Sequence, residues 1–452
     1  MADQAVARWW GRQTELAIAN FPISGEPMPW PVVEALLLVK AEAARANADL
    51  GVIPRETADA IERAVAELVD EKMVEQFPVD VFQTGSGTST NMNVNEVVAH
   101  RASEVLRAAV HPNDHVNTSQ SSNDTFPSAV RIAAARTTVH EVLPALDSLA
   151  EALTELAHRH LDTVKAGRTH LMDAVPMTFG QEVAGWARVV RLGRERFEAA
   201  LPRVLELPLG GTAVGTGLNA PEDFAAAVIE GLARRTGLAL REAVDHFEAQ
   251  SSQDALVEIG ATAKVVALGL HKIAGDLRLL GSGPATGLGE LRLPELQAGS
   301  SIMPGKVNPV IAEVVQQVAA QVVGNDAAAT FAATASTLQL STAMPLLARS
   351  VLSSLTLIAS ATNVLAERCV RGIEVDGDRM ARHAASSAAL VTSLAPTIGY
   401  DAAARLVRQA VAEGRPVRDV VTDAGLVDEQ TLDAAMDLGA MARPRVSRGG
   451  PG

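Results

Sequence analysis

The stretch GSSIMPGKVNP, residues 299–309, separates two long segments whose apolar residues recur at helical spacing. Four of its eleven residues are glycine or proline, which interrupt regular helices, so the stretch predicts a mobile loop. Within it, Lys306 supplies a cation and Asn308 supplies amide donors, and both suit a carboxylate. We therefore predict a flap that closes over an anion. The alternative is an ordinary connection rich in glycine, serine and proline.

The same region lacks a nucleotide-binding motif. Five residues separate Gly299 from Gly305, where a phosphate-binding loop needs four, and Val307 replaces the Ser or Thr that reaches magnesium. The glycine-rich stretch 281–290 follows a predicted helix instead of a strand, and its spacing is G-x-G-x-x-x-G. These departures argue against a dinucleotide site.

The composition indicates a soluble globular protein. With 452 residues and 48% hydrophobic content, the chain can bury a large core and divide into two or three domains. A net charge of -14 argues against nucleic acid and anionic membrane as partners. No uninterrupted apolar run reaches the roughly 18 residues of a membrane span, and no apolar signal segment opens the chain, so we expect a cytoplasmic protein. One cysteine, Cys369, excludes an intramolecular disulfide and an iron-sulfur cluster.

Apolar periodicity predicts many helices. Residues 31–50 and 55–73 are typical of amphipathic helices, each placed next to a proline. Apolar residues in 142–160, 256–280 and 351–365 step by three and four positions, a coiled-coil-like period. Helices of this length predict a bundle that runs through an oligomer, because a single subunit would leave apolar stripes uncovered.

A first polar stretch, TGSGTSTNMNVNE at 84–96, runs into an apolar helix expected from Val97. Backbone N–H groups at such a junction, with the hydroxyls of Ser86 and Thr88 beside them, form an anion cradle. An elaborate helix N-cap is the alternative.

A second polar stretch, HPNDHVNTSQSSNDTFP at 111–127, also leads into a helix. His111 and His115 have the spacing of a metal pair, but Pro112 makes a shared helix face doubtful and no third ligand is evident. We therefore expect no zinc site here.

Two titratable residues near these stretches suit acid-base chemistry. His170 is the one imidazole of the predicted loop GRTHLMDAVP at 167–176. Glu313 falls in the first turns of a helix expected after Pro309. Taken alone, the histidine is equally suited to a structural role and the glutamate to routine capping of a helix N-terminus.

Together, the polar stretches resemble the fumarase/aspartase superfamily, and specifically the cluster-free (class II) fumarate hydratases. The resemblance extends from about residue 11 to about residue 439, and the GSSIMPGKVNP stretch is the family's signature. It implies an all-α, three-domain helical fold with a mixed helical domain at 1–120, a central bundle of long helices at 121–373 and a small helical domain at 374–452. It also implies a homotetramer whose active sites are shared by three subunits, with no cofactor and no metal.

The resemblance assigns roles to individual residues. Ser300 is implied as the base that removes a proton beside a carboxylate, and His170, oriented by Glu313, as the group that handles the hydroxyl or water. The implied contacts to the dicarboxylate substrate are Ser86, Thr88, Ser121, Ser122, Asn123, Thr169, Ser301, Lys306 and Asn308. A secondary anion site is implied at His111, Pro112, Asn113 and Asp114.

The implied reaction is the reversible hydration of fumarate to (S)-malate by anti addition and elimination through an aci-carboxylate carbanion. Donors such as Lys306 strengthen as negative charge develops on the carboxylate, which agrees with that chemistry. His170 and Gly305 favour fumarase, whereas Gln339 is more typical of aspartase. Ser341 and the following Thr342 depart from both branches. An aspartate ammonia-lyase or related C4-diacid lyase therefore remains open, as does a non-catalytic helical scaffold.

Overall fold

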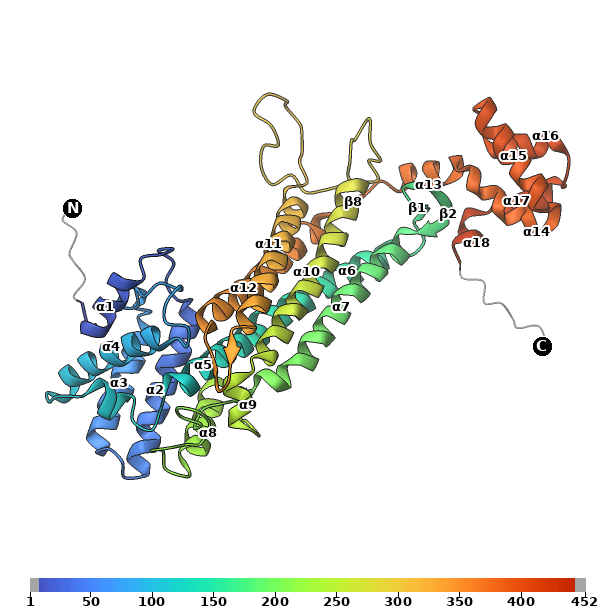
Figure 1. Ribbon diagram of the computed structural model, residues 1–452. Coiled ribbons are helices and arrows are strands. Elements are labelled where there is room, and N and C mark those ends of the chain that lie inside the picture. Colours follow the sequence, from blue (N-terminus) through green and yellow to red (C-terminus); the bar gives the residue numbers. More distant parts are fainter. Residues whose placement is uncertain (1–7, 444–452) are drawn as a thin grey trace, which may run out of the picture. The chain divides into compact units, whose positions relative to one another are not determined.

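A computed structural model describes residues 8–443 (Figure 1). These residues form two compact units, and the first comprises residues 8–145, 193–268 and 317–360. The second comprises residues 146–192, 269–316 and 361–443. The described residues are mainly helical, and their strands pair only in twos, so the predicted all-α class is confirmed. The predicted division into three domains stays a prediction.

The first unit begins with five helical elements, and the second of them is unusually buried. Its first elements are α1 (Arg12–Asn20), α2 (Trp30–Asp49), α3 (Arg55–Asp70), η1 (Val74–Gln76) and α4 (Thr88–Leu106). Helix α2 starts at Trp30, and its second residue is the Pro31 that the sequence placed at a helix-opening position; the helix is buried along most of its length. Helix α3 follows Pro54 and buries one apolar face. Both predicted helices are confirmed to within about three residues.

Helix α4 begins earlier than the sequence predicted. It starts at Thr88, nine residues before the expected Val97. Gly87 precedes it with φ 77°, a left-handed conformation that glycine adopts without strain, and a Cβ atom there would lie 2.3 Å from the ring of Phe126. The amide-rich first turns are therefore helical, because their side chains find partners elsewhere in the unit.

A nearly continuous helical run follows, and short elements complete the list. The run consists of η2 (Pro112–Val116), α5 (Ser122–Thr137), η3 (Thr138–Val142) and α6 (Leu143–Arg159). From Leu146 onward α6 belongs to the second unit. The first unit also contains α8 (Phe224–Thr236), α9 (His246–Ser251), the parallel pair β3 (Glu206–Leu207) and β4 (Arg241–Glu242), and the antiparallel pair β6 (Ser336–Thr337) and β7 (Leu340–Ser341).

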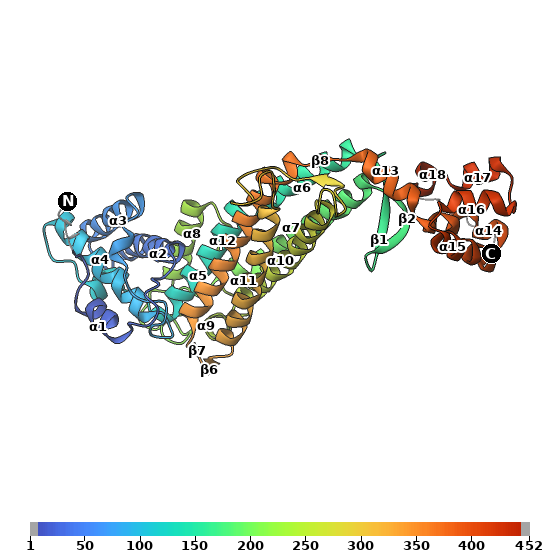
Figure 2. The same cartoon turned by 90° about the horizontal axis from the view of Figure 1, so that it is seen from above.

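Long helices form the bundle that the periodicity predicted. They are α7 (Phe179–Val204), α10 (Asp254–Leu280), α11 (Val310–Ala333) and α12 (Met344–Arg368), each with residues in both units (Figure 2). Within the first unit, Lys264 of α10 donates to Asp326 of α11 at 2.5 Å. Within the second, the indole N–H of Trp186 in α7 donates to Asp276 of α10 at 3.0 Å.

Helix α12 also forms part of a long apolar segment. Residues 344–372 are long and apolar enough to cross a membrane by length and composition alone, although 67% of the most apolar window is buried inside the protein. The core helix of a soluble protein passes the same test. Just past α12 lies the thiol of Cys369, which is buried, and burial raises its pKa to about 12.

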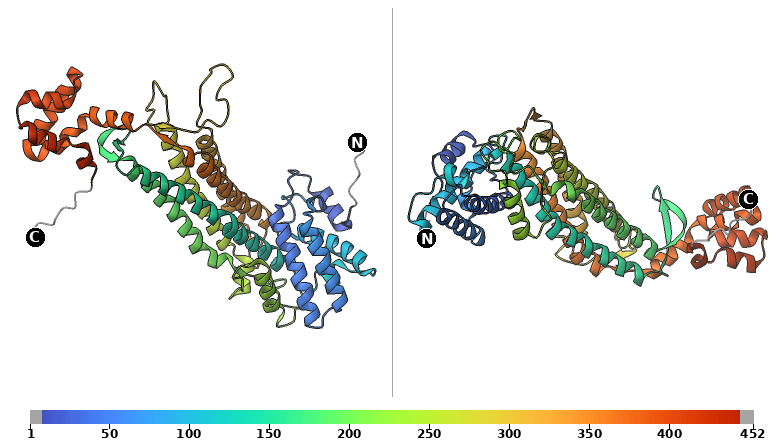
Figure 3. Two further views of the ribbon diagram at one scale, coloured as in Figure 1. Left: turned by 180° about the vertical axis from the view of Figure 1, so that it is seen from behind. Right: turned by 90° about the horizontal axis from the view of Figure 1, so that it is seen from below.

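The second unit holds a hairpin and a cluster of short helices. The hairpin is the antiparallel pair β1 (Val164–Thr169) and β2 (Met172–Thr178). The remaining elements are the antiparallel pair β5 (Leu291–Arg292) and β8 (Glu374–Val375), then η4 (Val370–Gly372), α13 (Gly377–Ser386), η5 (Ala388–Leu394), α14 (Ala395–Ile398), α15 (Tyr400–Glu413), α16 (Val417–Ala424), α17 (Glu429–Ala435) and α18 (Leu438–Ala442). The helices from η5 to α17, orange to red in Figure 3, enclose a core that includes Leu390, Leu406 and Val420.

Candidate active site

Three predicted substrate-contact residues meet in the first unit. The Ser86 and Thr88 hydroxyl oxygens lie 2.7 Å apart, and the Thr88 hydroxyl lies 2.7 Å from that of Ser122. These side chains stand at the first turns of α4 and α5, where backbone N–H groups lack partners inside the helix. Hydroxyl donors beside two helix N-termini make this cluster suited to a carboxylate.

The two other predicted residues of this segment fix the start of α5. The Ser121 hydroxyl accepts from the backbone N–H of Asn123 at 3.2 Å, and the Ser121 N–H donates to Asp124 Oδ1 at 2.9 Å, which forms a capping box. The Asn123 amide donates to the backbone carbonyl of Ala213 at 2.8 Å. Both residues therefore lie beside the hydroxyl cluster, with Asn123 also attached to the neighbouring loop.

Asp124 joins the start of α5 to that same loop. Its Oδ2 accepts the backbone N–H groups of Gly210 and Thr212, each at 3.0 Å, and its side chain is fully buried. Burial raises the pKa of Asp124 to about 6, and the backbone hydrogen bonds only partly oppose that effect. The carboxylate thus holds together two segments that flank the hydroxyl cluster.

Lys40 supplies a buried cation beneath this site. Its ammonium donates to Asn117 Oδ1 and to Gln120 Oε1, each at 2.9 Å. Burial lowers the pKa of Lys40 to about 7, against the attraction of Asp124. Sequence reasoning missed both charges. The sequence signal for Lys40 was its position directly after the apolar run LLLV in a predicted helix. Charged residues are rarely buried unless paired, so a lysine at such a position indicates a buried cation with polar partners.

The predicted flap is a compact exposed loop of the second unit. The Ser300 hydroxyl accepts from the backbone N–H groups of Ile302 at 3.2 Å and Met303 at 3.1 Å. The Asn308 amide donates to the Gly299 carbonyl at 2.7 Å, and a Cβ atom at Gly299 would lie 1.9 Å from the Lys306 carbonyl oxygen. Ser301 and the Lys306 side chain are exposed. Glycine at 299 is therefore required for the two ends of the flap to approach each other.

The segment 167–176 is a β-hairpin and not the loop that the sequence predicted. Thr169 ends β1, and His170 with Leu171 forms the two-residue turn, at φ 54° and 61°. Positive φ at both positions is the requirement of a type I′ turn, which is uncommon for these residue types. The hairpin thus presents an exposed Thr169 and His170 at its end.

Glu313 lies in the first turn of α11, as predicted. Its Oε1 is 3.7 Å from a guanidinium nitrogen of Arg278, and both side chains are partly exposed. Among residues 8–443 no hydrogen bond joins His170 to Glu313 within one chain. The pairing of these two residues stays a prediction.

The predicted secondary anion site is an exposed helical turn. The His111 ring accepts through Nδ1 from the backbone N–H groups of Asn113 at 3.3 Å and Asp114 at 3.0 Å, and Pro112 opens the turn. The ring of His115 accepts from the His111 N–H at 2.9 Å. The two histidines thus cap their own turn. Across the part of the chain that the structure describes, no group of three His, Cys, Asp or Glu side chains is placed to hold a metal ion.

Comparisons with known proteins give consistent results over nearly the whole chain. Residues 2–324 match the family described as "Lyase", and residues 390–443 match "Fumarase C C-terminus". Fumarate hydratase class II of Corynebacterium glutamicum is 51% identical, over 96% of this chain and 93% of that protein. The Mycobacterium tuberculosis protein of the same description is 49% identical, over 96% and 92%.

Solved structures agree in fold with this chain. The recombinant class II fumarase of Schistosoma mansoni superposes with a TM-score of 0.94 at 36% identity, over 97% of this chain and 96% of that one. A Brucella melitensis fumarate lyase:delta crystallin, crystallised with cobalt, superposes with a TM-score of 0.92 at 42% identity, over 98% of each chain.

Proposed function

The chain belongs to the class II fumarate hydratase family of lyases, and we propose that it interconverts fumarate and (S)-malate. The observation that carries this function is an identity of about 50% to curated class II fumarate hydratases over 96% of the chain. The cluster of Ser86, Thr88 and Ser122 hydroxyls at two helix starts supports an anionic substrate.

In the proposed reaction, donors bind the two carboxylates of the substrate before any bond breaks. The hydroxyl cluster, with Asn123 beside it, binds one end, and Lys306 and Asn308 of the flap bind the carboxylate next to the reacting carbon. Thr169, Ser121 and Ser301 complete the set of polar contacts. A cation and amide donors are suited to this task because they bind the doubly charged aci-carboxylate more strongly than the ground state.

Proton transfer then involves Ser300 and His170. In the dehydration direction, the Ser300 oxyanion removes a proton from the carbon beside the carboxylate, and the electron pair moves onto that carboxylate. The electron pair then returns from that carboxylate to form the C=C bond as the hydroxyl group on the adjacent carbon leaves from the opposite face, and a proton from His170 converts the hydroxyl to water. The backbone N–H groups of Ile302 and Met303 donate to the Ser300 oxygen, which favours its charged form.

We also propose a homotetramer in which several subunits contribute to each active site. His170 at the hairpin turn is exposed and Glu313 at the start of α11 is partly exposed, so both can be reached by a neighbouring subunit, which supports a pairing of His170 with the Glu313 of another subunit. Exposed apolar side chains on α10 and α11, such as Leu268 and Val314, support further helix packing between subunits. A cytoplasmic location, without nucleic-acid or membrane partners, is proposed on the acidic charge and the single cysteine.

The test is a substrate panel on purified protein in the presence of a chelator. Loss of fumarate absorbance, and its recovery from malate, is the expected result. A Ser300→Ala preparation purified in parallel controls for host fumarase. Absence of turnover in both directions would refute the function, and faster fumarate formation from aspartate than from malate would establish the ammonia-lyase alternative.

A further inference from the structure

The end of the β1–β2 hairpin has little apolar packing within the chain. Leu171 in the turn and the adjacent Met172 are 73% and 69% exposed. A cavity of about 290 Å³ lies beside this end, lined by Arg168, Leu171, Asp173, Leu279, Leu288, His383 and Ser386. The rest of the hairpin packs against α13, α18 and η5, so polar contacts near the turn add to that packing in fixing where the turn lies.

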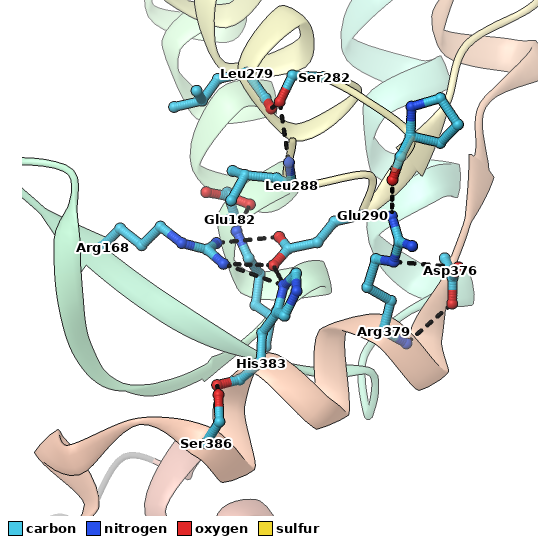
Figure 4. A network of polar contacts seen from close by, with 12 residues as sticks. Arg168, Glu182, Leu279, Ser282, Leu288, Glu290, Asp376, Arg379, His383 and Ser386 are labelled. Carbon is cyan, nitrogen blue, oxygen red and sulfur yellow. Dashed lines mark hydrogen bonds and ion pairs between the residues drawn. The ribbon is translucent and has the colours of Figure 1, made fainter. Parts of the chain in front are cut away.

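Arg168 is the residue of β1 that makes these contacts. It pairs in register with Asp173, one step before the last pair of the hairpin, Thr169 with Met172. The register shifts between Ala166 and Arg168, as in a β-bulge, which redirects the side chains that follow. Figure 4 shows the Arg168 side chain extended away from the hairpin toward Glu290.

Glu290 receives that side chain in a bidentate pair. Arg168 Nη2 donates to Glu290 Oε1 at 2.6 Å and Nη1 donates to Oε2 at 3.1 Å, and the carboxylate is fully buried. Burial alone would raise the pKa of Glu290, but hydrogen bonds from Arg168 and His383 outweigh it and hold the pKa below its usual range. The carboxylate is therefore ionised and firmly held near neutral pH.

Three other segments hold Glu290 itself in place. Its backbone N–H donates to the Leu280 carbonyl at the end of α10 at 2.9 Å. Its carbonyl accepts from the Asp376 N–H, just before α13, at 3.0 Å. The ring of His383 in α13 donates through Nδ1 to Glu290 Oε1 at 2.7 Å. Glu290 thus connects a long helix and the C-terminal helices to the strand that leads into His170.

We propose that Glu290 is a positioning residue for the reaction: acting through Arg168, it fixes the hairpin turn and thereby the place of the His170 imidazole. This inference rests on the proposed function, in which His170 transfers a proton. Loss of an orienting partner typically lowers activity about 10- to 100-fold, because proton transfer requires the imidazole within hydrogen-bond reach of the substrate.

Glu290→Gln is the central variant, because glutamine keeps the size of the side chain but replaces one of the two acceptor oxygens by an NH2 donor, which breaks the bidentate pair with Arg168. We expect kcat to fall about 10- to 100-fold with KM for malate nearly unchanged. If Glu290 acts through His170, the same substitution in a His170→Asn background should cause little further loss of kcat. His383→Gln, which leaves the Arg168–Glu290 pair in place, should cause a smaller loss than Glu290→Gln.

A second ion pair on the same hairpin provides the matched control. Lys165, at the opposite end of β1, donates to Glu182 of α7 at 2.6 Å and is nearly as buried as Glu290. Glu182→Gln therefore breaks a comparable pair three residues before Arg168 on the same strand, and Lys165 acts on Glu290 only through electrostatic attraction. Its kcat should stay close to that of the unaltered protein.

Hydrogen exchange of the segment 164–178 supplies a measurement that does not depend on turnover. Glu290→Gln should speed exchange at the turn-proximal amides, whereas Glu182→Gln should affect only the amides near Lys165. Unchanged exchange at the turn, or an equal further loss of kcat in the His170→Asn background, would overturn the proposal. If the unaltered protein does not hydrate fumarate, the proposed function fails while the exchange data still decide whether Glu290 holds the turn.

Discussion

Replacing Lys40 by methionine tests how much the buried hydrogen bonds of Lys40 near the hydroxyl cluster contribute to stability. Methionine is nearly as long as lysine and fits an apolar helix, so the change removes the ammonium with little change in packing. Two hydrogen bonds are lost, one to Asn117 Oδ1 and one to Gln120 Oε1. Asn117 Oδ1 still accepts from the Asn91 amide at 3.1 Å, so Gln120 Oε1 is the acceptor that loses its donor.

The size of the effect follows from these contacts. A buried acceptor without a donor costs about 1–3 kcal/mol. Asp124 loses only the electrostatic attraction of Lys40 and keeps three backbone N–H donors, so its contribution to the loss is small. Because methionine carries no charge, the free-energy cost of burying the Lys40 ammonium disappears, and this offsets part of the lost stability. We therefore expect the free energy of unfolding to fall by about 1–3 kcal/mol.

Urea-induced unfolding at a fixed protein concentration measures this change, because the stability of an oligomer depends on concentration. Lys272→Met is the control: it removes an exposed lysine paired with Asp276, and exposed pairs contribute at most about 1 kcal/mol. Adding Gln120→Leu to Lys40→Met removes the orphaned acceptor and should recover part of the stability. A Lys40→Met protein as stable as the Lys272→Met control would contradict the reasoning.

Three further predictions concern the reaction and the pH dependence of stability. Ser300→Ala should abolish turnover while leaving binding of a dicarboxylate inhibitor nearly intact, and near-normal kcat would rule out its role as the base. Glu313→Gln should lower kcat about 10- to 100-fold, and adding it to His170→Asn should cost little more, whereas additive losses would mean that the two residues act independently. Because the pKa of Asp124 is raised from 3.8 to about 6, its contribution to stability is present below pH 3.8 and is lost as pH rises through about 6. Asp124→Asn should remove that slope from denaturation curves recorded across this range, and an unaltered slope would assign it to other groups.

Much of the helical framework is predictable from apolar spacing alone. The periods in 256–280 and 351–365 lie within α10 and α12, because helices buried along one stripe must place apolar residues every three to four positions. The start of α4 was predicted wrongly because its first turns are polar and lack apolar spacing. Asn91 and Asn93 make poor helix interiors in isolation, but their amides donate to Asn117 Oδ1 and to the Gln76 carbonyl, contacts that sequence spacing does not reveal.

The hairpin was missed because its strands give almost no sequence signal. β1 contains Gly167 and β2 contains Pro176, both of which argue against a strand in the middle of a sheet. Each strand here has only one neighbour, so a missing N–H is tolerated. Glu290 was missed because it meets Arg168 across 122 positions of sequence. The sequence thus predicted the polar stretches at helix junctions but not the buried charges, Asp124 and Glu290, whose hydrogen bonds fix those stretches in place.

Because the thiol of Cys369 is buried, its chemical labelling can measure local unfolding of this protein. With a pKa raised to about 12 by burial, only roughly one thiol in a hundred thousand is ionised near pH 7, and the packing around it excludes reagents. A thiol-specific label therefore reacts when the end of α12 detaches from its neighbours, and each chain takes up one label because it has one cysteine. The rate of labelling therefore measures how often that local unfolding occurs, and no substitution in the native sequence is needed.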